Sequence, residues 1–81
     1  MIDVKTAIAM LEKQFPDKRI DGNPSQVDDL LIFGFVDKTA TEEEAKWDNT
    51  VVGVNRFTGK ISWHSLFDEN IMKNAKPITD Y

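Results

Sequence analysis

The residues best suited to chemistry surround the only histidine of the chain, His64 in the stretch "ISWHS". An imidazole serves as a general base, a metal ligand or a proton shuttle, and Ser62 and Ser65 lie close to it in the sequence. A serine–histidine mechanism also needs an orienting carboxylate, and adjacent residues of a strand do not point at each other. One histidine without any cysteine does not supply the ligand set of a transition-metal site. We therefore expect no catalytic residue, no metal site and no cofactor, and so no enzyme.

Acidic side chains form the second candidate group, in an aspartate pair at 28–29 and a glutamate run at 42–44. Calcium loops space their oxygen ligands at alternating positions around a glycine turn, and these acids lack that spacing. Two-carboxylate hydrolysis needs a cleft, for which 81 residues leave little wall. Residues 21–48 nevertheless hold eight acids and two bases, a net charge of −6, whereas the rest of the chain carries +2. This acidic middle either steers a basic partner or is a solvated loop.

Aromatic and basic residues alternate in a third group, where Arg56 and Lys60 flank Phe57 and Trp63 follows. Aromatic rings between bases can stack on single-stranded nucleic acid. Two bases make a thin patch, however, and the overall net charge of −4 opposes binding of phosphates. We expect no nucleic-acid partner. Together with Trp47, the two aromatic residues are either interface anchors or ordinary core.

Length and composition indicate one domain, residues 1–81, with one modest core. The chain is 41% hydrophobic and 30% charged, and it has no cysteine, which excludes a disulfide framework. Its first residues have charges inside their apolar pattern rather than the apolar region of a signal peptide. No run approaches the roughly 18 apolar residues of a membrane span. We expect a cytoplasmic protein without a membrane partner.

The elements that position these residues begin with a helix at 4–15. Its apolar residues recur from Val4 at the spacing of one helical stripe, Asp3 is a suitable N-cap, and Pro16 ends the run. The unbroken apolar run at 30–36 predicts a central strand shielded on both sides. Gly34 within it leaves space for a closely packed helix or a bulge.

The links between these elements are predicted from turn residues. Asp21-Gly22 and Asn23-Pro24 are typical turn pairs, after a short strand at 18–20 that we leave open. Thr41 with a glutamate three residues later matches a capping box, so that 42–47 is either one turn of helix or a mobile polar loop.

The second half predicts a strand at 50–57, a turn at Thr58-Gly59 and a return strand in which Ile61 and Trp63 share one face. Ser65 then caps a last helix, which Pro77 stops. The expected fold class is α+β: an N-terminal helix, a three- to four-stranded antiparallel sheet and a C-terminal helix, with the helices mainly on one face.

Residues 4–63 resemble a PepSY-type domain, in which an N-terminal helix precedes antiparallel strands and a closing hairpin. That resemblance implies a regulator or inhibitor of partners such as proteases, with no catalytic constellation. Three features depart from the family: the absence of an export signal, the acidic insertion at 37–49 and the extra C-terminal helix. In style alone, the chain is also similar to small phage, mobile-element and toxin-immunity proteins. The matching residues are Phe15, Pro16, Val54, Asn55, Thr58, Gly59, Lys60 and Ile61.

The function expected from the sequence is therefore a small non-enzymatic module that binds another protein and acts as its inhibitor or regulator. The alternative is a structural or self-associating protein, such as a homodimer that buries the apolar face of Leu31, Phe33 and Phe35. The predicted partner-binding residues are Glu42, Glu43, Glu44, Trp47, Arg56, Phe57 and Lys60.

Overall fold

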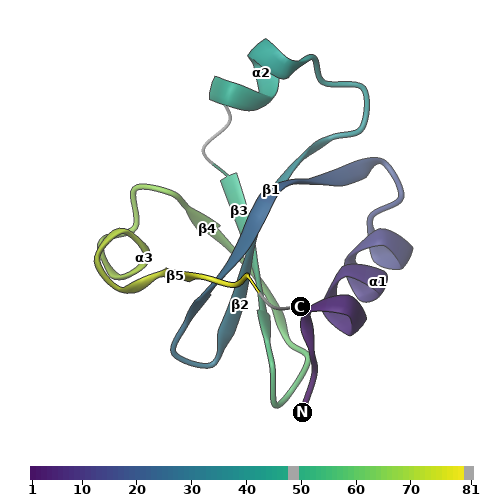
Figure 1. The fold of residues 1–81 in the computed structure, drawn as a ribbon. Helices are drawn as coiled ribbons and strands as arrows, with labels where there is room; N and C mark the ends of the chain where they lie inside the picture. Colours follow the sequence, from purple (N-terminus) through teal and green to yellow (C-terminus); the bar gives the residue numbers. More distant parts are fainter. Residues whose placement is uncertain (48–49, 80–81) are drawn as a thin grey trace.

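The computed structural model describes the backbone of residues 1–47 and 50–79, and the side chains of these residues except at positions 46 and 47. The chain is an α+β domain with an N-terminal helix, an antiparallel sheet and a short C-terminal helix, which confirms the predicted class (Figure 1). In chain order, the elements are α1 (Val4–Gln14), β1 (Lys18–Val27), β2 (Leu30–Asp37), α2 (Glu42–Trp47), β3 (Thr50–Asn55), β4 (Ile61–Ser65), α3 (Glu69–Asn74) and β5 (Lys76–Pro77).

The sheet has five strands in the order β4-β3-β2-β1-β5, one or two more than the sequence predicts. The first four strands pair antiparallel in chain order, with α2 in the connection between β2 and β3, and the two-residue β5 adds to the outer edge of β1. The extra strand comes from the residues around Pro77, which end α3 as expected and then pair with β1 at Ser25 and Gln26. That pairing depends on contacts distant in sequence, which local patterns do not contain.

Local sequence determines α1 almost completely. The Asp3 carboxylate accepts a hydrogen bond from the Thr6 backbone N–H at 2.8 Å, and Phe15 is the C-cap ahead of Pro16. On the apolar stripe, Ala7 and Leu11 are completely buried. The helix and its N-cap are thus confirmed within one residue of the predicted bounds.

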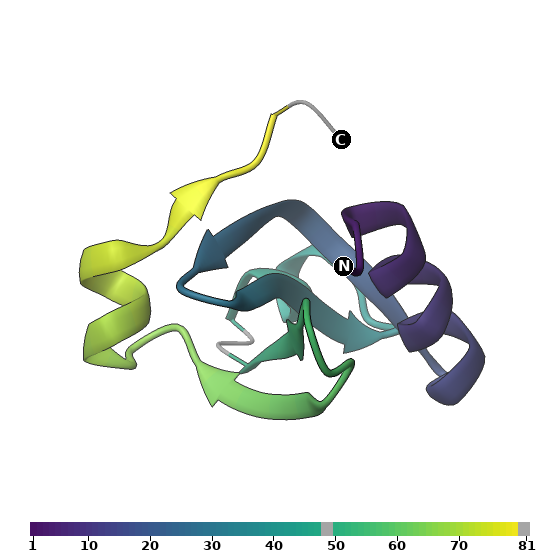
Figure 2. The same cartoon turned by 90° about the horizontal axis from the view of Figure 1, so that it is seen from below.

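The two faces of the sheet carry separate cores, and the helices divide between them. The first core joins α1 to the β2 residues Leu31, Phe33 and Phe35. The second joins Ile71 of α3 to Ile32 on the opposite face of β2. The sequence places the helices mainly on one face, whereas α1 and α3 lie on opposite sides of the sheet (Figure 2). The reason is that β2 is apolar on both sides, so each face needs its own cover.

β1 differs most from its prediction. Instead of turns at Asp21-Gly22 and Asn23-Pro24, the chain continues as one strand that is interrupted by a bulge between Asp21 and Ser25. The reversal occurs at the pair 28–29, where Asp28 adopts a φ of 51° in a two-residue hairpin loop. Among the residues that the structure describes, no helix has the length and apolar character needed to cross a membrane.

Candidate functional site

His64 and Ser62 lie on the same face of β4, as the alternation predicts, and contact each other directly. Ser62 Oγ and His64 Nε2 are 2.7 Å apart. The imidazole lies over Gly53 of β3, where an added Cβ would be 3.2 Å from Nε2. In the described part of the chain, no carboxylate hydrogen-bonds this histidine. The pair consequently lacks the orienting acid that a serine–histidine mechanism requires.

The predicted acidic surface begins with a formed capping box at the start of α2. The Thr41 backbone N–H donates to Glu44 Oε1 at 3.0 Å, and the Glu44 backbone N–H donates to Thr41 Oγ1 at 3.2 Å. These hydrogen bonds hold the pKa of Glu44 below its ordinary value of 4.5. Glu42 and Glu43 are exposed on the same turn. Of the two predicted alternatives for this segment, a turn of helix or a mobile polar loop, the structure shows the helix. The side chain of Trp47 lies outside the described part of the structure.

The predicted basic surface lies on the loop between β3 and β4. The Asn55 carboxamide oxygen accepts hydrogen bonds from the backbone N–H groups of Phe57 and Thr58, which ends β3 at Asn55 rather than at residue 57. Gly59 takes a φ of 76°, as a tight hairpin loop requires. At the tip, Phe57 is 65% exposed and Lys60 is also exposed.

The structure does not bring the two predicted surfaces together. α2 precedes the start of β3, whereas the hairpin tip follows its end, and the two lie at opposite ends of the sheet (Figure 1). A partner that touches Glu42 and Lys60 at once must span the whole length of β3. The alternative oligomer surface also changes, because Phe33 and Phe35 are fully covered within the domain. Those two rings are not available to a second copy.

An open groove of about 380 Å³ is the surface that the sequence did not indicate. It lies on the α3 face of the sheet, between α3 and α2, with the central strands as its floor. Its apolar floor includes Ile32 and Val51, and Ala45 is the α2 residue that lines it. Leu66 and Met72 also line it, although they are 45% and 66% exposed. The sequence shows that both residues are apolar. It does not show where they lie, because their position depends on how the chain around α3 crosses the sheet.

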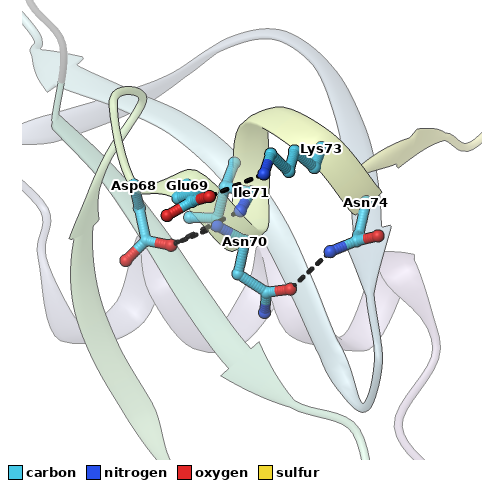
Figure 3. A network of polar contacts seen from close by, with 6 residues as sticks. All are labelled: Asp68, Glu69, Asn70, Ile71, Lys73 and Asn74. Atoms are coloured by element: carbon cyan, nitrogen blue, oxygen red, sulfur yellow. Dashed lines mark hydrogen bonds and ion pairs between the residues drawn. The ribbon is translucent and has the colours of Figure 1, made fainter.

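Local polar contacts stabilise the short helix α3 itself, and Figure 3 shows them at close range. Asp68, rather than the predicted Ser65, is the N-cap, since its carboxylate accepts from the backbone N–H groups of Asn70 and Ile71. Ser65 instead ends β4 and its hydroxyl accepts from the Phe67 backbone N–H. The side-chain pair Glu69–Lys73, at 2.6 Å, lies along the exposed side of α3 while Ile71 is buried below.

The remaining polar groups do not assemble into a reactive centre. In the two described stretches, no group of three or more histidine, cysteine, aspartate or glutamate side chains is arranged to hold a metal ion. The one buried side-chain nitrogen or oxygen without a hydrogen-bond partner in those stretches is Nε of Arg56. The groove and the exposed apolar side chains are therefore the features with most capacity to bind. No protein-family model, curated protein or solved structure matches this chain.

Proposed function

We propose that the protein is a non-enzymatic binding module of the cytoplasm that docks a basic, amphipathic segment of another protein in the groove between α2 and α3. The observation that carries the proposal is the pairing of an apolar groove with a helix of three consecutive glutamates at one end. Docking would mask the bound segment, so the action is that of an inhibitor or regulator. Such an action is also what the PepSY-type resemblance implies.

Leu66 and Met72 are the exposed apolar side chains at the groove. Both side chains leave about half or more of their surface in water although the groove beside them is lined by Ile32, Val51 and Ile71. Exposed apolar side chains that adjoin a hollow mark interaction sites more often than scattered ones do. A partner side chain that fills the groove would remove this surface from water at about 25 cal/mol per Å².

The acidic side chains near the groove determine which charge the partner segment should carry. Ala45 belongs to the helix that bears Glu42 and Glu43, whereas Asp21, which also lines the groove, is paired with the Arg19 guanidinium at 3.6 Å. Both glutamates are exposed, so the negative electrostatic potential at this end of the groove extends into solvent. A segment with lysine or arginine on one side would be attracted to it, whereas an acidic segment would be repelled.

The test uses synthetic amphipathic peptides built from leucine and lysine, with leucine–glutamate peptides of the same length as the opposite charge. We expect the basic peptide to bind at least about tenfold more tightly, with NMR shift changes centred on Ile71 and Met72. The E42Q/E43Q double variant should bind about threefold to tenfold more weakly, since exposed charges each contribute little. Glu12→Gln on α1, which lies on the other side of the sheet, removes one exposed charge away from the groove and should leave affinity unchanged.

Apolar docking is tested separately with Met72→Ser, which we expect to weaken the basic peptide about fivefold or more. Phe57→Ser removes an equally exposed apolar side chain at the far end of the sheet and is its control. Equal affinity for basic and acidic peptides would contradict the proposal. So would shift changes that lie outside the groove.

A further inference from the structure

The two edges of the sheet are built differently. The outer edge of β1 is interrupted by a bulge, contains Pro24, and is covered at Ser25 and Gln26 by β5. These are the devices by which natural sheets prevent strand-to-strand association. β4 has none of them: Ile61–Ser65 contains no proline, lysine or acid, and its register with β3 has no shift. Within the described residues, no element pairs with its outer side (Figure 2).

The pairing of β4 with β3 determines which backbone N–H and C=O groups of β4 point outward. The Asn55 backbone N–H donates to the Lys60 carbonyl at 2.9 Å, so the pair 55–60 is a hydrogen-bonded position of the ladder. Bonded and non-bonded pairs alternate along antiparallel strands. Trp63, opposite Val52, is therefore at a non-bonded position. Its backbone N–H and C=O, with those of Ile61 and the N–H of Ser65, point away from β3 toward the open edge. The Ser65 C=O accepts a hydrogen bond from the Asp68 N–H at 3.0 Å, and its second lone pair remains for the edge.

Exposed aromatic side chains accompany this edge. Trp63, in the middle of β4, is 48% exposed although its ring packs edge-on against Phe15 at 5.4 Å between centroids. Phe57 at the preceding tip and Phe67 in the following turn are 65% and 68% exposed. With Leu66, which lines the groove, four of the large apolar side chains left in water thus occur within the eleven-residue segment 57–67 that bounds the open strand.

We propose that β4 pairs antiparallel with β4 of a second copy of this chain, around a two-fold axis at Trp63. This is beyond the proposed docking of a partner segment, because it uses the edge of the sheet rather than the groove. The outward-pointing groups of Trp63 face those of Trp63 in the second copy, and Ile61 faces Ser65. The two five-stranded sheets become one continuous sheet, and the half-exposed indoles become cross-strand neighbours.

Charge complementarity favours a second copy as the occupant. Lys60 immediately precedes β4, and Asp68 follows it by three residues. Antiparallel pairing brings the start of one β4 to the end of the other, so each basic tip approaches the acidic start of α3 in the other copy. Both ends of the interface then join opposite charges, and the strand between them contains no Lys, Arg, Asp or Glu. The edge is only five residues long, so the association is weak and concentration-dependent.

Sedimentation velocity across the micromolar to millimolar range tests the proposal on the full chain. The expected result is a reversible monomer–dimer equilibrium. Trp63→Lys places two ammonium groups opposite each other at the axis and should weaken dimerisation at least tenfold. Trp63→Tyr keeps an aromatic ring on Phe15 and should dimerise within about threefold of the parent.

A second measurement needs no substitution in the domain and reports the register directly. In a mixed sample of isotope-labelled and unlabelled chains, intermolecular NOEs should connect Ile61 of one copy to Ser65 of the other. A chain that stays monomeric at the highest concentration overturns the proposal. A dimer without those NOEs, or one that Trp63→Lys leaves intact, overturns it as well.

Discussion

At the scale of single residues, the capping box of α2 makes a defined prediction about acid. Hydrogen bonding to Thr41, first from its backbone N–H and then through its side chain, lowers the pKa of Glu44 from 4.5. A carboxylate with a lowered pKa in the folded state stabilises α2 fully above its ordinary pKa, and this contribution is lost as pH falls through the lowered value. The contribution of Glu44 to α2 should therefore be complete well above pH 4.5 and be lost only under more acidic conditions.

NMR titration of the Glu44 carboxyl carbon measures that shift, and amide exchange across residues 42–45 follows the helix. Thr41→Ala removes the hydroxyl of the box, so the pKa of Glu44 should rise toward 4.5. Thr39→Ala, two residues before the box, is the control and should leave it unchanged. Because the backbone N–H of residue 41 remains, a pKa of Glu44 that Thr41→Ala does not move would refute the contribution of the Thr41 side chain.

At the scale of elements, the bulge of β1 explains why β2 contains a glycine. A Cβ at residue 34 would lie only 2.3 Å from the backbone oxygen of Asp21, which is at the point where the register shifts. Backbone cannot yield as a flexible side chain can, so Gly34→Ala should destabilise the domain by about 3 kcal/mol. Gly22→Ala meets no atom within 4 Å and is strained only by its φ of +77°, so it should cost about 1 kcal/mol. Urea unfolding compares them, and equal losses would contradict this role of the bulge.

The elements also show what a sequence can and cannot predict. α1 is predicted well because its stripe and its Asp3 cap are local features. β1 is predicted poorly because Gly22 and Pro24 have the character of turn residues, yet a neighbouring strand with Gly34 accepts them in a bulged edge. The start of α3 moves from Ser65 to Asp68 for a similar reason, since pairing with β3 extends β4 through Ser65.

At the scale of the whole molecule, the predicted partner-binding residues of α2 and of the β3–β4 loop lie at opposite ends of the sheet. Glu42, Glu43 and Phe57 are exposed, which the polar character of their surroundings suggests. The groove was not foreseen, because it exists only where α3 crosses the face opposite α1. The open edge of β4 depends likewise on the order of all five strands. Surfaces made by tertiary arrangement have no local sequence pattern from which to be predicted.

The two surfaces proposed here should be separable, because one is a face of the sheet and the other is an edge. The Trp63→Lys variant should dimerise at least tenfold more weakly yet bind the basic peptide with the affinity of the parent. Met72→Ser should lose peptide affinity yet sediment as the parent does. Effects of substitutions that share no contact add independently, so the double variant should show both losses at their single-variant sizes. If either single variant impairs both readouts, the groove and the edge are one coupled surface, and the division between partner docking and self-association is wrong.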